Sequence, residues 1–243
     1  MTKTVFTLDL GNSNPHVGHF ESGRLLEVMT WNEFRKKWPA NKLSSQQLIK
    51  SQVGNNPEGL EDYLVFCQEV PKLEKLRFLE MPVFYSETLG FDRLYQAYLA
   101  YKKFASTGPV AVIDAGTFIT MDLIDSKGFQ GGYIFPGLTP FLSSYRQGSQ
   151  LPALKLDHWQ SAENLPQTTE AAILQATQFY LQKIVSGFLD QTSPAKLILT
   201  GGAHGLIESA LKNEKLLKKV ELVSEPHFIH EALFKIFIAK DAR

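Results

Sequence analysis

The fold of this chain is predicted first from residues 109–122, which read PVAVIDAGTFITMD. The apolar run 110–113 is typical of a buried strand, and a second strand follows the turn at its end. Asp114 ends the first strand, and Gly116 and Thr117 form the turn. The glycine lets the backbone approach a ligand, while N–H groups of the turn and the Thr117 hydroxyl can donate to phosphate oxygens. Because a carboxylate repels phosphate, Asp114 predicts a cation beside it.

The same arrangement occurs near the start of the chain, where the apolar run 5–8 leads into Asp9, Gly11 and the polar pair 12–13. A weaker echo lies at 197–202, where an apolar strand is followed by threonine and two glycines. A single Asp-x-Gly turn is more often an ordinary hairpin than a ligand site. Two such turns at the ends of matching strands indicate two related halves that close on one nucleotide.

The composition is typical of a globular protein with one large domain or two small ones. The 243 residues are 44% apolar, and 25 basic residues balance 25 acidic ones. Zero net charge argues against a nucleic-acid partner, and no apolar run reaches membrane-spanning length. Asp9 interrupts the apolar segment near the N-terminus, so no signal peptide is expected. The single cysteine, Cys67, is expected to be a buried, unreactive thiol in a reducing cytoplasm.

The order of the predicted elements favours an α/β fold with mixed sheets. Strands are predicted close together before any helix, which argues against a doubly wound nucleotide-binding fold because that fold needs an early crossover helix. A helix predicted over 92–104 is stopped by the segment STG at 106–108, after which the strand-turn-strand pattern restarts. We therefore expect two domains, residues 1–108 and 109–243, each with a mixed sheet flanked by helices.

Several local predictions concern single segments. Residues 63–68 are predicted as a strand. Gly131-Gly132 with Pro136-Gly137 is either a turn and a loop after a strand, or a set of small residues that lets two backbones, or a backbone and a ligand, approach closely. His227 and His230 share a face of the last predicted helix and are expected at its surface. No metal-ligand spacing relates the six histidines, at positions 16, 19, 158, 204, 227 and 230. The chain contains neither the lysine-bearing phosphate loop nor the G-x-G-x-x-G pattern, which excludes the P-loop and dinucleotide folds.

The stretch Gly90-Phe91-Asp92-Arg93 allows two interpretations. Asp92 can be the N-cap of the helix behind it, accepting an N–H of the first turn. It can also be a general base that removes a proton from a hydroxyl attacking phosphate, with Arg93 holding an anionic part of the substrate. One carboxylate at a helix start can serve both purposes. Thr168, which opens the predicted helix 168–189, is by itself typical of a helix cap.

Taken in order along nearly the whole chain, these motifs resemble those of the type III pantothenate kinases. The matching stretches are DLGNS (9–13), GFDR (90–93), DAGT (114–117) with Thr120 and Asp122, GGYI (131–134) with PG (136–137), T-x-E-A (168–171) and TGG (200–202). The resemblance implies the duplicated fold of the acetate kinase, sugar kinase, Hsp70 and actin superfamily, with two ribonuclease H-like domains. It also implies that the protein uses ATP to phosphorylate pantothenate to 4′-phosphopantothenate, the first step of coenzyme A biosynthesis.

The resemblance assigns roles to individual residues. Those implied for ATP are Asp9, Leu10, Gly11, Asn12, Ser13, Asn14, Pro15, His16 and Thr117. Those implied for pantothenate are Tyr85, Gly90, Phe91, Asp92, Arg93 and Thr168. Asp92 would be the catalytic base, and Asp9 would lie near Mg²⁺, directly or through water. Asp114 would bind the monovalent cation, K⁺ or NH₄⁺. The implied assembly is a homodimer in which Thr168 reaches the site of the partner subunit.

The chain departs from the family pattern at a few positions. Pro15 and His16 follow the first loop where the family carries an aliphatic residue and often lysine. Val83 stands at the position of the family's usual tyrosine, and Tyr85 follows two residues later.

Two other functions remain open from the residues. One is a non-catalytic regulatory homologue, similar to an accessory factor for transcription. The other is a kinase of the same superfamily that acts on a different small hydroxyl acid. The presence of Asp9, Asp92 and Asp114 favours a kinase, because a protein that only binds a ligand does not need all three carboxylates.

Overall fold

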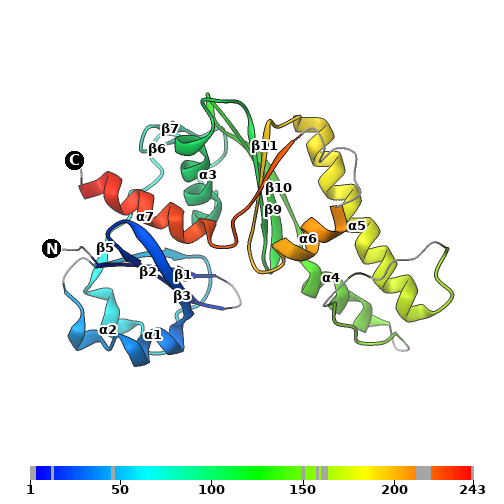
Figure 1. The fold of residues 1–243 in the computed structure, drawn as a ribbon, viewed down its shortest axis with the longest axis horizontal. Helices are drawn as coiled ribbons and strands as arrows, with labels where there is room; N and C mark the ends of the chain where they lie inside the picture. The colour runs from blue at the N-terminus through cyan, green and yellow to red at the C-terminus, as the bar shows by residue number, and fades with distance from the viewer. Residues whose placement is uncertain are drawn as a thin grey trace. The chain divides into compact units, whose positions relative to one another are not determined.

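The computed structural model describes residues 4–11, 14–44, 47–148, 151–156, 159, 164–211 and 220–241, and the chain forms two compact units (Figure 1). Unit 1 comprises Met1–Lys103 and His227–Arg243, and unit 2 comprises Phe104–Pro226. Among the described residues, no helix combines the length and the apolar character needed to cross a membrane.

Unit 1 is built on a five-stranded mixed sheet with the strand order β3-β2-β1-β4-β5. Its strands are β1 (Thr4–Leu10), β2 (His16–Glu21), β3 (Arg24–Thr30), β4 (Leu48–Gln52) and β5 (Cys67–Gln68). β1 pairs antiparallel with β2 and parallel with β4. The other elements are α1 (Trp31–Lys37), η1 (Ala40–Lys42), α2 (Glu61–Leu64), the hairpin of β6 (Arg77–Phe78) and β7 (Met81–Pro82), α3 (Phe91–Lys103) and α7 (Phe228–Asp241).

The two faces of the first sheet are covered by different helices. Alternate side chains of β1, Phe6, Leu8 and Leu10, are fully buried in a cluster with Phe34 of α1 and Tyr63 of α2. The intervening side chains point to the opposite face because successive residues of a strand alternate. On that face α7 packs on β1, β2 and β4, and α3 packs on α7 and β4.

Unit 2 is built on a second five-stranded sheet with the order β10-β9-β8-β11-β12. Its strands are β8 (Val110–Ala115), β9 (Phe118–Asp125), β10 (Gly128–Pro136), β11 (Lys196–Thr200) and β12 (Glu221–Ser224). Its helices are α4 (Leu138–Ser144), η2 (Tyr145–Gln147), α5 (Thr169–Thr192) and α6 (His204–Leu211). Leu181 and Val185 of α5 and Ile207 of α6 are fully buried against Ile113 and Leu199 of the sheet.

The two sheets have the same topology, which confirms the predicted internal duplication. In each sheet the first strand pairs antiparallel with the next one along the chain and parallel with the one that returns after a crossover. Asp9 and Asp114 occupy the same place, the penultimate residue of β1 and of β8. The predicted α/β fold with two mixed sheets is therefore confirmed.

Several local predictions are wrong. Residues 63–68 are not one strand: the chain forms the short helix α2, and only Cys67 and Gln68 pair with β4. The reason is that Tyr63 is buried in the core while the two next residues, Leu64 and Val65, are both exposed, so the segment lacks the alternation of a half-buried strand. Cys67 itself is half-buried, and burial raises the pKa of its thiol.

The segment 131–137 is also largely strand rather than turn, because β10 extends to Pro136 with an irregularity between Phe129 and Gly131. A β-carbon at Gly132 would lie 2.0 Å from the Met121 carbonyl oxygen of β9. The glycine is therefore required for close strand pairing.

The last helix, α7, packs in unit 1, whereas the sequence division placed it with residues 109–226. Its Phe234 ring stacks on Phe20 of β2, with centroids 4.4 Å apart, and its Glu231 pairs with Lys103 of α3. Together these contacts attach the end of the chain to the first sheet.

His230 of α7 is buried, which corrects the expectation that it lies at the surface. Its Nδ1 shares a hydrogen bond of 2.9 Å with the Thr7 hydroxyl of β1, and a β-carbon at Gly18 would lie 2.9 Å from the same nitrogen. Burial, together with the neighbouring His227 and His16, lowers the pKa of His230 to about 3. The buried imidazole is therefore neutral at pH 7.

We predict that the stability of the protein falls between pH 6.5 and 3 because of His230. In the unfolded chain His230 has its ordinary pKa of 6.5. Between pH 6.5 and 3 the unfolded chain therefore binds a proton at His230 that the folded protein does not bind, and this lowers the free energy of unfolding by up to about 1.4 kcal/mol per pH unit. Urea unfolding of the wild type at pH 7 and pH 5 should show this loss. His230→Gln should show a smaller loss, and the control His204→Gln should behave as the wild type. An unchanged difference in His230→Gln would contradict the prediction.

Candidate functional site

The turn after β1 brings Asp9 next to polar residues of both neighbouring strands. Asp9 pairs with His16 of β2 and with Ser51 of β4. Because paired residues of adjacent strands project to the same face of a sheet, these three side chains lie side by side on the face that α7 covers. Gly11 follows in the turn, and a β-carbon on it would lie 3.8 Å from the Asp9 carboxylate.

Other residues predicted for ATP lie in or beside the same turn. Leu10 turns its side chain into the core, so that only its backbone faces the turn. Asn14 is exposed, and the Pro15 carbonyl accepts a hydrogen bond of 3.0 Å from Trp31 N–H. His16 is half-buried, and both burial and His227 lower its pKa. Asn12 and Ser13 lie outside the described residues.

The loop after β4 packs directly on this turn. The N–H groups of Val53 and Gly54 both donate to the Leu10 carbonyl, at 3.2 and 2.8 Å. A β-carbon at Gly54 would lie 2.3 Å from the Gly11 carbonyl oxygen. Val53 and Gly54 therefore support the turn. The sequence did not reveal this, because the residues of one strand do not determine which strand it pairs with.

The second group of predicted residues lies at the start of α3. The helix begins at Phe91, so that Asp92 is in its first turn rather than at the N-cap, and its Oδ1 accepts a hydrogen bond of 2.8 Å from Arg93 N–H. A β-carbon at Gly90 would lie 2.7 Å from that same Oδ1. Burial raises the pKa of Asp92, although the Arg93 N–H and guanidinium oppose the shift.

Arg93 is buried, and its guanidinium carbon lies 5.1 Å from the centre of the Tyr85 ring. The arrangement is a cation–π contact, which holds the planar guanidinium in one orientation. Tyr85 is half-buried, whereas Val83, at the family's usual tyrosine position, is 1% exposed and packed inside. Phe91 is 45% exposed and stacks on Tyr95. Tyr85, not Val83, therefore presents its ring to the start of α3.

In unit 2 the turn after β8 is held by two other glycine motifs. The Gly137 N–H donates to the Thr117 carbonyl at 3.0 Å, and a β-carbon at Gly137 would lie 2.4 Å from the Gly116 carbonyl oxygen. Gly201, with φ +83°, leaves room for Asp114, whose Oδ1 would be 2.3 Å from a β-carbon there. The structure thus brings together three motifs that are far apart in the sequence: 114–117, 136–137 and 200–202.

Thr168 is the exposed N-cap of α5, and its hydroxyl accepts a hydrogen bond of 3.2 Å from Ala171 N–H.

A metal ion at the turn after β1 or the turn after β8 would have few protein ligands. Among the described residues, no three His, Cys, Asp or Glu side chains are arranged to hold a metal ion together. A single carboxylate with nucleotide phosphates and water is, however, the usual donor set for Mg²⁺. Asp9, half-buried at the end of β1, fits such a set.

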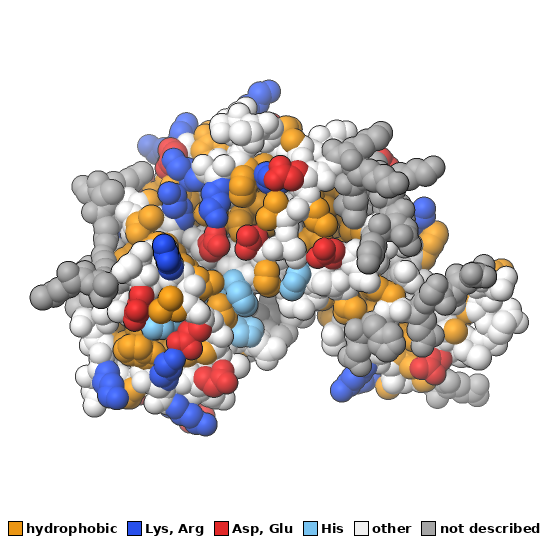
Figure 2. Space-filling model, viewed as in Figure 1, with side chains coloured by type: hydrophobic (Ala, Val, Ile, Leu, Met, Phe, Trp, Pro, Cys, Tyr) orange, Lys and Arg blue, Asp and Glu red, His pale blue; other side chains and the backbone are white. Residues whose placement is uncertain are grey.

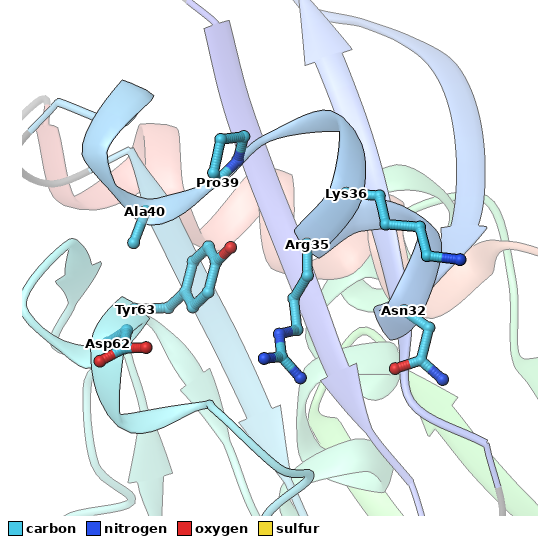
Figure 3. A pocket seen from close by; sticks show the side chains of 7 residues that line it. All are labelled: Asn32, Arg35, Lys36, Pro39, Ala40, Asp62 and Tyr63. Atoms are coloured by element: carbon cyan, nitrogen blue, oxygen red, sulfur yellow. The ribbon is translucent and has the colours of Figure 1, made fainter.

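A separate pocket of about 630 Å³ opens beside α1, η1 and α2 (Figure 3). Its lining residues are Asn32, Arg35, Lys36, Pro39, Ala40, Asp62 and Tyr63. It lies on the face of the sheet that α1 and α2 cover, which buries Phe6 and is opposite to the face of Asp9, so we do not assign it to the candidate site. The lining contains no histidine. Figure 2 shows several histidine side chains at the surface of the molecule.

The duplicated sheets with their carboxylate-bearing turns define the class of the fold, that of actin-like ATPases and sugar kinases. The solved activator of 2-hydroxyisocaproyl-CoA dehydratase from Clostridium difficile, with bound ADPNP, has this fold. It matches 98% of this chain and 96% of its own, with a TM-score of 0.58 and 12% identity. A Campylobacter jejuni protein described as a proposed Baf family transcriptional activator matches 98% of this chain and 100% of its own, with a TM-score of 0.63 and 20% identity.

Residues 5–191 match the family described as type III pantothenate kinase, and the chain belongs to that family. The type III pantothenate kinase of Rhodopirellula baltica is 31% identical over 169 residues, which are 66% of this chain and 58% of that protein. The type III pantothenate kinase of Persephonella marina is 25% identical over 237 residues, covering 86% of this chain and 91% of the relative.

We predict that Gly54→Ala weakens nucleotide binding. The added methyl group cannot fit beside the Gly11 carbonyl, so the turn after β1 must move. Calorimetric titration with ADP and Mg²⁺ should show at least about tenfold weaker binding, equivalent to about 1.4 kcal/mol.

The matched control is Gly187→Ala in the middle of α5, where a β-carbon meets nothing within 4 Å. This variant should bind as the wild type and be stabilised by up to about 1 kcal/mol, because alanine favours a helix over glycine. If Gly54→Ala bound the nucleotide as tightly as Gly187→Ala and the wild type do, the loop after β4 would not support the nucleotide turn.

Proposed function

We propose that this protein uses ATP to phosphorylate the primary hydroxyl of pantothenate, giving 4′-phosphopantothenate. The observation that carries the proposal is the pair of matching Asp-x-Gly turns, one at the end of β1 and one at the end of β8, in a chain that belongs to the type III pantothenate kinases. Each turn carries a glycine, which lets the backbone approach a ligand closely, and turns of this type can present N–H groups to phosphate oxygens; both properties support the proposal.

We assign ATP to the turn 9–16 and to Thr117. The residues assigned in that turn are Asp9, Leu10, Gly11, Asn12, Ser13, Asn14, Pro15 and His16. Backbone N–H groups would donate to the phosphates, and the Asp9 carboxylate would hold Mg²⁺, directly or through water. Mg²⁺, when bound, would neutralise part of the negative charge of the phosphates. The half-buried position of Asp9 at a strand end supports this role.

We assign pantothenate to the start of α3. The Arg93 guanidinium, oriented by Tyr85, would pair with the substrate carboxylate, while Gly90 and Phe91 would shape the site. Asp92 would accept the proton of the primary hydroxyl as its oxygen attacks the γ-phosphorus and the bond to ADP breaks. The pKa of Asp92, raised by burial, supports this role because a base is most effective with a pKa near the working pH.

We further propose that Asp114 binds a monovalent cation, K⁺ or NH₄⁺, and that the enzyme is a cytoplasmic homodimer. The half-buried Asp114 carboxylate beside Gly201 supports the cation site. Exposed apolar side chains of the chain are available for a partner subunit to cover. In unit 2 these include Phe118, Tyr133, Ile134 and Phe179, which are 43–61% exposed. In the dimer, Thr168 would reach the pantothenate of the partner subunit.

A second candidate function is a regulatory homologue without catalysis, which the likeness to the Campylobacter jejuni protein favours. The discriminating experiment is turnover. Purified protein with ATP, Mg²⁺, K⁺ and pantothenate should form phosphopantothenate, and omission of K⁺ should reduce the rate. ATP binding without any product, while a control kinase works in the same buffer, would favour the regulatory function. A panel of other small hydroxyl acids would reveal a different acceptor.

We predict that Asp92→Asn lowers kcat by at least about 100-fold, because an amide cannot accept the proton. Its fold should persist, which circular dichroism and thermal unfolding can check. The control Asp62→Asn changes an exposed carboxylate in the first turn of α2 and should leave kcat unchanged.

The wild-type kcat should also decline as the pH falls through the raised pKa of Asp92, since the protonated acid is not a base. Unchanged turnover in Asp92→Asn would remove Asp92 from the mechanism.

A further inference from the structure

The hydroxyl of Ser51 is a buried polar group that no role described so far uses. Ser51 is 0% exposed, and within the described part of the chain its Oγ has no hydrogen-bond partner. A buried hydroxyl without a partner costs about 1–3 kcal/mol, and each such group in a folded protein calls for an explanation. A valine or alanine would avoid this cost, so the hydroxyl indicates a partner that becomes available in another state.

The partner is indicated by the position of Ser51 in the sheet. Ser51 is the fourth residue of β4 and pairs with Asp9 of the parallel strand β1. Neighbouring strands lie about 4.8 Å apart, and paired side chains project to the same face. Rotation of Ser51 about one χ1 bond therefore directs its O–H along the sheet, towards the side chain of Asp9. An ionised carboxylate offers about four acceptor sites, so Asp9 can accept this donor in addition to others.

The strand end that carries Ser51 is held rigidly against β1. Two N–H groups of the following residues, Val53 and Gly54, donate to the Leu10 carbonyl. Gly54 also packs on Gly11 with no room for a β-carbon. Ser51 and Asp9 consequently keep their register, and a hydrogen bond between them requires only side-chain rotation.

We propose that Ser51 is a positioning residue for Asp9, whose carboxylate it holds by a hydrogen bond when a nucleotide and Mg²⁺ are bound. This inference rests on the proposed function, in which Asp9 holds Mg²⁺. A hydrogen bond to an ionised carboxylate is about twice as strong as one between neutral groups and fixes the carboxylate's orientation. The free protein carries the unpartnered hydroxyl, and binding satisfies it. His16, on the other side of Asp9, is the competing donor.

Three variants of Ser51 separate the hydroxyl from its volume. Ser51→Ala removes the hydroxyl, Ser51→Cys replaces it by a slightly larger thiol that is only a weak donor, and Ser51→Thr keeps the hydroxyl and adds a methyl group. The matched control is Thr177→Val, which removes a buried hydroxyl that is satisfied by the Ile173 carbonyl of its own helix at 2.8 Å. Each protein is titrated calorimetrically with ADP, once with MgCl₂ and once with EDTA, and unfolded in urea without ligand.

We expect Ser51→Ala and Ser51→Cys to bind ADP about tenfold more weakly with Mg²⁺ and within twofold of the wild type without it. Ser51→Thr and Thr177→Val should bind as the wild type in both conditions. Free Ser51→Ala should be as stable as the wild type or more stable, because it loses an unpartnered buried group. If the Ser51 hydroxyl served only to stabilise the fold, free Ser51→Ala would instead be less stable than the wild type.

Three outcomes would overturn the inference. Weaker binding to the same extent with and without Mg²⁺ would mean that Ser51 shapes the turn rather than the metal ligand. Unchanged binding in Ser51→Ala would mean that His16 or another donor, rather than Ser51, orients the Asp9 carboxylate. Wild-type binding of ADP with Mg²⁺ in Ser51→Cys would mean that the weaker binding of Ser51→Ala comes from lost packing rather than from the lost hydrogen bond. If the wild type itself fails to bind ADP with Mg²⁺, the proposed function fails, and this result is distinct from the other three.

Discussion

Parallel pairing of the first strand of each sheet with the strand that returns after a crossover is the constraint on which the candidate site depends. In unit 1 the pairing of β1 with β4 sets Asp9 beside Ser51 and brings Gly54 onto the turn. In unit 2 the pairing of β8 with β11 sets Asp114 beside Thr200 and brings Gly201 against its carboxylate. At both places a side chain on the glycine would collide, so each acidic turn has room only because its neighbour has no β-carbon.

The polar residues of unit 1 lie on one face of its sheet because of strand alternation. Phe6, Leu8 and Leu10 occupy the opposite face and form the core with α1 and α2. The face of Asp9 is instead covered by α7, whose buried, neutral His230 bonds Thr7 two residues before Asp9. The end of the chain therefore contributes to the same face that carries the turn, and its packing depends on an imidazole that acid would charge.

The sequence allowed the two Asp-x-Gly turns, the duplicated mixed sheets and most long elements to be predicted, because these features are encoded locally. The helix at α3 was expected over 92–104 and begins at Phe91, and the long α5 was expected over 168–189 and spans Thr169–Thr192. The short segment at 63–68 was mispredicted, because the exposed pair Leu64 and Val65 interrupts the alternation of buried and exposed residues that a strand would show. The roles of the predicted site residues remain proposals.

The sequence alone allowed the class of fold and the kinds of side chain at the candidate site to be predicted, because strand patterns, glycine turns and carboxylates are visible among neighbouring residues. The partners of those residues depended on folding. Ser51 beside Asp9, Gly201 beside Asp114 and His230 against Thr7 are separated by tens to hundreds of positions. Their proximity follows from sheet register and from helix packing, which arise from long-range burial of apolar surface and leave no local signal in the chain.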